Sequence, residues 1–334
     1  MKNHKNIAVF IPHLGCKHNC IFCSQTKITG ASVMPDIKSE LECVKRTIEE
    51  GLSTVTEGET EIAFFGGSFT GIDREYMISL LELASGYIGE KVKGIRCSTR
   101  PDYVNREICD ILKNYGVTAV ELGIQSTDDK VLIASRRGHA AGDSKRACEL
   151  ISENGFELGG QMMIGLPLST AKSEIQTARD IVAFGAKTSR IYPAVVFENT
   201  RLFDMAKSGE YIPLTTDDAV SRAAACAEIF IKNNVSILRI GLHSSENLTN
   251  APYGANHPAI GELTEGEIYY NLIREQLEGI KADNITILIP PGELSKCIGH
   301  RGKNRKRFKE LYNKNINFLQ DGSLEKYSIK IISP

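Results

Sequence analysis

Short apolar runs alternate with amphipathic stretches from residue 7 to about residue 242. The apolar runs have the length of buried strands, and the stretches between them have helical periodicity. The expected strands span 7–12, 61–66, 94–98, 118–124, 157–164, 189–195 and 235–241. The expected helices span 37–50, 73–88, 103–115, 141–154, 172–185 and 216–233. Strands that alternate with helices form right-handed crossovers and a parallel sheet, which predicts an α/β protein with a partial or full (β/α) barrel.

The pattern changes after the last of these strands. Residues 244–261 are rich in Ser, Asn and Pro, which predicts a surface loop that returns over the barrel mouth. A helix is expected at about 262–279. The remaining residues predict a small α+β unit, with strands at 285–290, 316–319 and 327–332, a short helix at 292–298 and a basic helix at 303–312.

Composition places the chain among ordinary globular proteins. Its 334 residues are 42% hydrophobic and 24% charged, which allows one large domain and a small one. The net charge is −1, so any affinity for nucleic acid must be local. No apolar run has the length of a membrane span, and we expect no membrane partner. The apolar run after Lys5 is short and interrupted by Pro12, so it reads as a first strand and not as a signal peptide.

Three of the nine cysteines, Cys16, Cys20 and Cys23, form a CxxxCxxC run directly after the first expected strand. Such a loop can place three thiolates on three irons of a 4Fe-4S cluster and leave the fourth iron open. A structural zinc site is the alternative, but it needs a fourth ligand. His18 could serve in principle, although no second CxxC or HxxxH completes a site. The other cysteines show no pairing pattern, which fits a reducing cytosol and predicts a single cluster.

This motif resembles that of the radical SAM superfamily, whose open iron binds S-adenosylmethionine (SAM). In that superfamily the reduced cluster, with a reductant such as flavodoxin or ferredoxin, cleaves SAM to a 5′-deoxyadenosyl radical. The resemblance implies that Cys16, Cys20 and Cys23 ligate the cluster. It also implies that Phe22 packs near the adenine, with simple core packing as the alternative.

Candidate SAM contacts follow the second and fourth expected strands. Gly66, Gly67 and Ser68 resemble the superfamily's Gly-Gly-Glu turn, which bonds the ammonium of SAM, although Ser68 replaces the glutamate. A two-residue period places Glu121 and Gln125 on one face of the fourth strand. A buried carboxylate and amide need partners. The ribose and carboxylate of SAM could supply them, and a buried structural network is the alternative.

The blocks GGSFT, STRPD, VELGIQS, RRGH, GLP and RIYP resemble the radical SAM domain of the elongator catalytic subunit family, across about residues 7–242. That family modifies the wobble uridine of tRNA with an acetyl group from acetyl-CoA. It has a longer spacing between its first cluster cysteines, and its acetyltransferase domain does not fit into the fewer than 90 residues that remain here. Acetyl-CoA chemistry is therefore not expected. Arg190 and Tyr192 of the RIYP block are placed on the substrate side.

A second resemblance is to oxygen-independent coproporphyrinogen oxidase and its haem-chaperone relatives. Gln125, Arg137 and the GLP turn match positions that contact SAM, or lie beside it, in that family. Ser98, Gln161 and Gln25 stand where that family has a glutamate, an aspartate and a cysteine. Porphyrinogen decarboxylation is therefore less expected than RNA modification.

The C-terminal unit has the sequence Gly299-His300-Arg301-Gly302 between its two helices. This order resembles a minimal KH-type RNA-binding module, whose GxxG loop clamps a nucleic-acid backbone. GxxG alone is a weak signal, since another occurs at 86–89. More weight comes from seven cations without an acid between positions 294 and 309: Lys296, Arg301, Lys303, Arg305, Lys306, Arg307 and Lys309. Such a patch in a neutral protein is the footprint of phosphate binding, and a solvated or protein-docking helix face is the alternative.

Together these patterns predict a radical SAM (β/α) barrel at 1–245, a loop and bridging helix at 246–280 and a KH-like basic module at 281–334. We expect a cytoplasmic enzyme that uses one 4Fe-4S cluster to cleave SAM and modifies RNA, with tRNA as the favoured substrate. The expected RNA contacts are Gly299, His300, Arg301, Gly302, Lys303, Arg305 and Lys306. Two alternatives stay open: a radical SAM enzyme for a small molecule, and a cluster-containing or haem-carrying chaperone without turnover.

Overall fold

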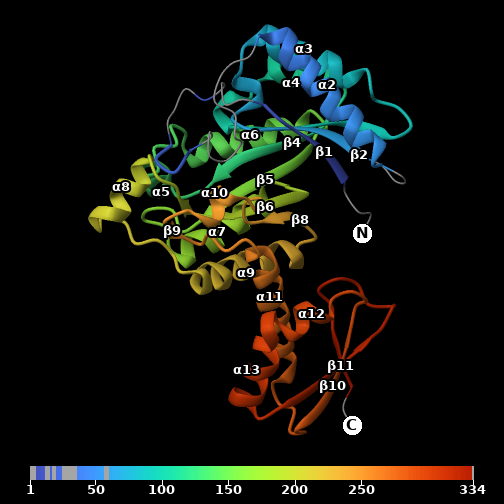
Figure 1. Cartoon of the computed structure of the whole chain (residues 1–334), viewed down its shortest axis with the longest axis vertical. Coiled ribbons are helices and arrows are strands. Elements are labelled where there is room, and N and C mark those ends of the chain that lie inside the picture. The colour runs from blue at the N-terminus through green and yellow to red at the C-terminus, as the bar shows by residue number, and fades with distance from the viewer. Residues whose placement is uncertain (1–4, 12–15, 17–19, 25–35, 56–59, 333–334) are drawn as a thin grey trace.

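Seven parallel strands form the central sheet of the protein (Figure 1). The computed structural model describes residues 5–11, 16, 20–24, 36–55 and 60–332. The strand order is β1-β2-β3-β4-β5-β6-β8, so β1 and β8 are the two edges of the described sheet. The strands are β1 (Lys5–Phe10), β2 (Thr60–Phe65), β3 (Val92–Thr99), β4 (Val117–Gln125), β5 (Glu157–Ile164), β6 (Thr188–Pro193) and β8 (Ser236–Ile240). This curled sheet confirms the prediction of a (β/α) barrel and makes it a partial one.

Helices join consecutive strands and pack on the outside of the sheet (Figure 1). Several begin at a side-chain cap, as when Asp73 accepts hydrogen bonds from two backbone N–H groups of the first turn of α3. The longer ones are α2 (Ile37–Ser53), α3 (Arg74–Ser85), α4 (Arg106–Asn114), α6 (Ala141–Glu153), α7 (Ala171–Ala183) and α9 (Thr216–Lys232), and the shorter ones are α5 (Asp129–Ala134), α8 (Arg201–Ser208) and α10 (Glu246–Thr249). Two short strands, β7 (Val195–Val196) and β9 (Tyr253–Gly254), form a separate antiparallel pair.

The central strands, β2 to β6, are largely buried on both faces, as expected for a parallel sheet covered by helices. On β4, Val120, Leu122 and Ile124 are fully buried in the main hydrophobic core, as the two-residue period predicts. Glu121 on the other face is also buried. One face of the sheet therefore packs on the helices, while the other carries buried polar groups into the interior of the partial barrel.

The C-terminal residues form a small unit with its own core. It consists of β10 (Asn284–Ile289), α12 (Leu294–Ile298), the 3-10 turn His300–Gly302, α13 (Lys303–Tyr312), β11 (Asn315–Gln320) and β12 (Lys330–Ile332). Strand β10 is central, parallel to β11 and antiparallel to β12. Helix α11 (Ile260–Leu277) connects this unit to the barrel, and Figure 1 shows the unit beyond α9 at the end of that helix. The domain limits 1–245, 246–280 and 281–334 stay predictions.

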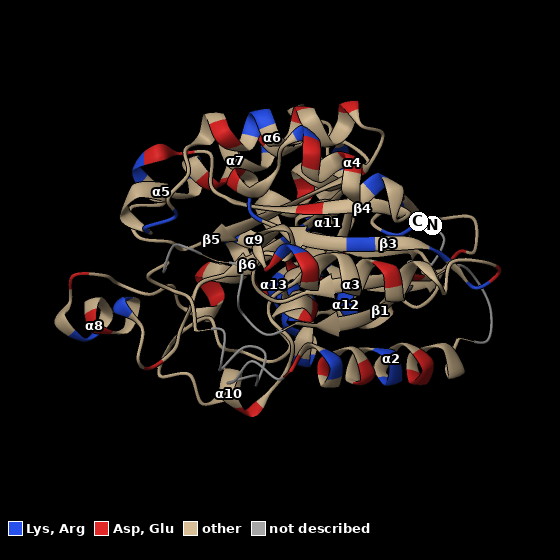
Figure 2. Ribbon diagram, turned by 90° about the horizontal axis from the view of Figure 1, so that it is seen from above, with Lys and Arg blue, Asp and Glu red and all other residues tan. Residues whose placement is uncertain are grey.

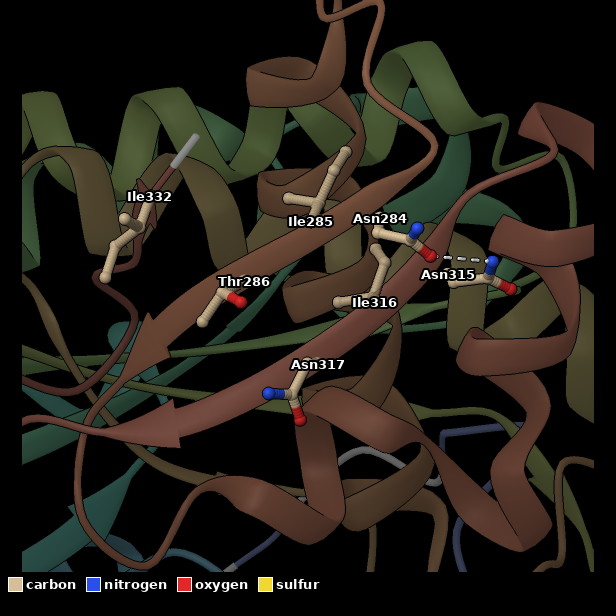
Figure 3. A pocket seen from close by; sticks show the side chains of 7 residues that line it. All are labelled: Asn284, Ile285, Thr286, Asn315, Ile316, Asn317 and Ile332. Carbon is tan, nitrogen blue, oxygen red and sulfur yellow. Dashed lines mark hydrogen bonds between the residues drawn. The ribbon is translucent and has the colours of Figure 1, made fainter. Parts of the chain in front are cut away.

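The outer face of the small sheet carries a shallow hollow of about 300 Å³. Figure 3 shows its lining side chains, which include no charged group and no cysteine. Asn315 donates a hydrogen bond to Asn284 at its rim (3.0 Å). The hollow therefore lacks the groups that the sequence predicts for the site. Figure 2 shows charges of both signs spread over the outer helices, and no helix in the described part of the chain is long and apolar enough to cross a membrane.

Candidate active site at the carboxyl ends of the strands

A cavity of about 410 Å³ lies at the carboxyl ends of the parallel strands. This is the end at which barrels of this type bind their ligands. Residues from β1 to β7, from the cysteine loop and from the segment after β8 line the cavity. The structure brings together here most of the candidates from the sequence: Cys16, Cys20, Phe22, Cys23, Gly66, Gly67, Ser68, Gln125, Arg137, Arg190 and Tyr192. Glu121 is the one candidate of the barrel that does not line it.

All three cysteines of the CxxxCxxC run face this cavity. The backbone N–H of Cys23 donates to the carbonyl of Cys20 (3.0 Å), so the second half of the loop is a tight turn. The sulfur of Cys16 lies 3.4 Å from the hydroxyl of Ser68, and burial raises the pKa of the Cys16 thiol. Among the described residues, no group of three or more His, Cys, Asp or Glu side chains is arranged to hold a single metal ion.

The glycine turn after β2 supports the cysteine loop. Gly66 has φ +93° and Gly67 has φ +46°, a region that side chains disfavour. A Cβ on Gly66 would lie 2.5 Å from the carbonyl oxygen of Ile11, the residue directly after β1. Only glycine fits this close approach, which leaves the backbone of the turn facing the cavity and places Ser68 beside Cys16.

Two polar side chains at the cavity wall have atoms without a partner. Gln125 adopts φ +66°, which is uncommon for a residue other than glycine. Its Oε1 is buried and accepts no hydrogen bond from the described residues. Arg137 donates to the carbonyl of Gly123 (2.7 Å) and to the sulfur of Cys20 (3.3 Å), while its Nε is buried without an acceptor there. Buried polar atoms are normally paired, so both atoms are suited to a bound ligand.

Arg100 belongs to the site although the sequence pattern does not single it out. It follows β3 directly, and Asp102 accepts two hydrogen bonds from its guanidinium, at 2.9 and 3.0 Å. Its Nη1 lies 3.8 Å from the sulfur of Cys20, and its Nη2 also donates to the carbonyl of Arg137. The available signal was its position at the end of a strand, immediately before Pro101 and Asp102.

Glu121 lies in a buried polar network beside the cavity. Its carboxylate accepts hydrogen bonds from Arg190 (2.6 and 3.1 Å) and from Gln161 (2.8 Å). Arg96 lies 3.7 Å from Glu121 and also pairs with Glu61 and Glu157, at 2.8 and 2.7 Å. The structural network that the sequence left open is therefore present, and contact of Glu121 with SAM stays a prediction.

The wall on the β6 and β8 side carries Arg190, Tyr192 and His243. The guanidinium of Arg190 lies over the ring of Phe65 (4.9 Å to the centroid) in addition to its pair with Glu121. Burial, together with the nearby Arg239, lowers the pKa of His243. No Asp or Glu is among the described residues that line the cavity. The lining instead includes Arg100, Arg137 and Arg190, whose guanidiniums can pair with anionic groups of a ligand.

The GxxG loop of the C-terminal unit is a separate, exposed feature. Gly299, Arg301 and Gly302 have φ of +78°, +52° and +74°. A Cβ on Gly299 would lie 2.8 Å from Cγ of Asn304, whereas nothing lies within 4 Å of one on Gly302. The side chain of Asn304 packs against Gly299 and donates a hydrogen bond to the carbonyl of Gly266 in α11 (2.7 Å), which joins the loop to that helix. The loop is thus fixed on one side and open on the other.

The cations around this loop are not equivalent, which corrects the impression of seven free charges. Lys296 pairs with Glu265 and Glu293, Lys303 with Asp217, and Arg307 with Glu267. In contrast, Arg301, Arg305, Lys306 and Lys309 are exposed and pair with no carboxylate in the part of the chain that the structure describes. The first three of these are predicted RNA contacts, and they are free to meet a phosphate.

Comparison with known proteins agrees with this geometry. A family model described as the radical SAM superfamily matches residues 10–181, and one described as a radical SAM C-terminal domain matches residues 186–270. An uncharacterized protein of Methanocaldococcus jannaschii is 29% identical over 62% of this chain and 66% of its own length. A tRNA uridine(34) acetyltransferase of Methanocaldococcus infernus is 32% identical over 36% of this chain, but over only 23% of its own length.

A solved structure with the same fold is the archaeal Elp3 of Methanocaldococcus infernus without its N-terminal residues. It superposes with a TM-score of 0.63 at 21% identity, over 83% of this chain and 64% of that one. The matched regions thus span less than two thirds of each of these three proteins.

Proposed function

Because this chain belongs to the radical SAM superfamily, we propose that it binds one 4Fe-4S cluster through Cys16, Cys20 and Cys23 and cleaves SAM in the adjoining cavity. The observation that carries this proposal is that the three thiols face the same cavity as the glycine turn after β2. Three cysteine sulfurs from one loop are a donor set typical of such a cluster with an open iron. A protein reductant of the flavodoxin or ferredoxin class would serve it.

The residues around the cysteines fit a bound SAM. The backbone carbonyl groups of Gly66 and Gly67 can accept hydrogen bonds from its ammonium group, because the turn has no side chains that would keep SAM away. The unpaired Oε1 of Gln125 and Nε of Arg137 can take its hydroxyl and carboxylate groups. Phe22 lies on the same wall and can pack against the adenine.

When bound, the cluster and SAM supply a hydrogen-abstracting radical, and the chain's own side chains orient the reactants and exclude water. Phe10, Phe65 and Met163 give the cavity an apolar wall, which removes solvent from the reaction space. Arg190 is held rigid by Glu121, so it can position an anionic part of the substrate. Tyr192 lies beside it on the same strand, and burial raises the pKa of its phenol, which keeps the hydroxyl protonated as a hydrogen-bond donor.

We further propose that the substrate is RNA, with tRNA favoured. Relatives of this chain include proteins named tRNA uridine(34) acetyltransferase, of whose lengths this chain matches between 23% and 52%. The free cations Arg301, Arg305 and Lys306 surround a loop whose Gly302 is open to close approach. A GxxG loop of this kind can hold phosphates while the base or ribose enters the cavity.

The test is release of 5′-deoxyadenosine from anaerobically reconstituted protein, with SAM and dithionite, in the presence and absence of bulk tRNA. We expect tRNA to stimulate release, and the Arg301→Ala/Arg305→Ala/Lys306→Ala variant to lose that stimulation while keeping its basal rate. Release that ignores RNA would direct the search to a small-molecule substrate. Complete absence of release under strong reduction would favour a non-catalytic, cluster-carrying or haem-carrying role.

A further inference from the structure

We propose that Arg137 and Arg100 tune the cluster: both guanidiniums donate N–H···S hydrogen bonds to the sulfur of Cys20 and thereby raise the cluster's reduction potential. They are positioning residues for a ligand of the cluster and not participants in hydrogen abstraction. The inference rests on the proposed cluster ligation by Cys16, Cys20 and Cys23. It adds a role that the sequence motifs do not assign to either arginine.

Arg137 is fixed with one nitrogen on Cys20. Its Nη1 lies 3.3 Å from the sulfur, and its Nη2 is anchored on the carbonyl of Gly123 at 2.7 Å. Arg137 is only 5% exposed, so solvent has little access to these donors. The backbone N–H of Ile21 also donates to the carbonyl of Ser135 (3.2 Å), which ties the cysteine loop to the turn that carries Arg137.

Arg100 approaches the same sulfur from β3. Its Nη1 lies 3.8 Å from Sγ of Cys20, a longer contact than that of Arg137. Asp102 holds its other nitrogens at 2.9 and 3.0 Å, so the guanidinium is locked in its plane. Because Arg100 also donates to the carbonyl of Arg137, the two arginines form one rigid unit around Cys20.

The positive charge of Arg137 is balanced by a negatively charged sulfur of Cys20. Asp102 compensates Arg100, but no carboxylate among the described residues pairs with Arg137. A buried guanidinium without a negative partner is strongly unfavourable. A thiol that ligates a metal is deprotonated, so a cluster-bound Cys20 provides the missing charge. The cluster edge at Cys20 is therefore a negative partner for this buried cation that is present without SAM, while the free Nε of Arg137 stays available to the SAM carboxylate.

This arrangement has a predictable electrochemical effect. Hydrogen bonds to the ligating sulfurs are among the factors that set the potential of an iron–sulfur cluster. Reduction adds one negative charge to the cluster, so nearby cations and N–H donors stabilise the reduced form more than the oxidised form. Removing Arg137 should therefore make the cluster harder to reduce, whether or not SAM is present.

The experiment is a potentiometric titration of the reconstituted cluster, followed by electron paramagnetic resonance, without SAM and without RNA. At a fixed solution potential, the ratio of reduced to oxidised cluster should fall about tenfold in Arg137→Gln, equivalent to a shift of about 59 mV. Arg146→Gln is a matched control, because this arginine is exposed on α6 and pairs with Asp143. Its titration should coincide with that of the wild type.

Three outcomes separate the explanations. An unchanged SAM-free potential in Arg137→Gln, with weaker SAM binding, would make Arg137 a SAM ligand only and overturn the inference. If Arg137→Gln takes up no cluster, Arg100→Lys decides: this variant keeps the charge but loses the fork that Asp102 holds, so a shift to lower potential supports the inference and no shift overturns it. A wild type that binds no cluster would refute the proposed function itself.

Discussion

The cavity and the GxxG loop use positive charge in opposite ways. Around the cavity, Arg96 and Arg190 are buried and each is held by carboxylates at hydrogen-bond distance. Around the loop, Arg301 and Arg305 are exposed and free of such partners in the described chain. A buried cation needs a neighbouring negative group because it has lost its hydration, whereas an exposed cation stays hydrated and needs no such partner. The first arrangement builds a rigid site, and the second suits a charged partner that arrives from solution.

The strongest way to break this comparison is to remove a cluster ligand. Cys20→Ala should abolish cluster binding, because the loop has only three cysteines and the proposed cluster uses the thiolates of all three. Iron content and visible absorption after anaerobic reconstitution measure the effect. Cys43→Ala is the matched control, since Cys43 is an exposed thiol on α2. A normal cluster in Cys20→Ala would disprove the ligand assignment.

The next largest effect should come from the buried network. Glu121→Gln should lower the free energy of unfolding by about 3–5 kcal/mol, because it leaves the buried guanidinium of Arg190 without its counter-charge. Urea unfolding followed by circular dichroism measures this.

Glu157→Gln is the comparison variant for Glu121→Gln. The Glu157 side chain is 40% exposed and is one of several partners of Arg96, so its loss should cost less than about 1 kcal/mol. Equal effects of the two substitutions would show that burial does not distinguish these carboxylates.

A smaller and pH-dependent effect should come from His139. Burial, together with Arg137, lowers its pKa to about 4, below the ordinary value of about 6.5. The unfolded chain therefore binds a proton in this window that the folded chain does not, so stability falls as the pH drops from 6.5 towards 4. The loss of unfolding free energy should reach about 3 kcal/mol between pH 6.5 and pH 4. His139→Gln has no group that titrates in this range, so this part of the pH dependence should disappear. Urea unfolding at pH 7 and pH 5 would reveal it, and identical pH dependence in the two proteins would contradict it.

The smallest effect on stability should come from the loop cations. Arg301→Ala/Arg305→Ala/Lys306→Ala should change the free energy of unfolding by less than about 0.5 kcal/mol, as is usual for exposed side chains. Its affinity for tRNA should nevertheless fall. The slope of log affinity against log salt should become shallower by roughly 2 to 3, one phosphate contact for each lost cation. A salt titration that matches the wild type would exclude these residues from the RNA interface.

The fold could be predicted because each buried strand shows as a local run of apolar residues in the sequence. The expected strand at 118–124 and the observed β4 at Val117–Gln125 differ by one residue at each end. Elements without a local pattern were not predictable. The two-residue strands β7 and β9 are too short to show a period, and they pair across more than fifty residues of chain.

Site residues could be predicted where they belong to a local sequence motif. They could not be predicted where their role depends on a contact with a residue far away in the sequence. The cysteine spacing identified the loop, and the paired glycines identified the turn after β2. Arg100 reaches a cysteine 80 positions away in the sequence, and Glu121 meets an arginine 69 positions away. Nothing in the local sequence of these residues shows which partner folding will bring to them.

Helix α11 belongs to two cores at once. Ile260 and Ile268 pack in the core of the barrel, while Tyr270 and Ile273 pack in the core of the small unit. Its 18 residues extend about 27 Å as one rod, and its Gly266 lies directly beneath the GxxG loop. The loop and the barrel are therefore joined through one continuous helix. If the loop binds RNA as proposed, the length of this helix would set how far the target nucleotide lies from the bound phosphates.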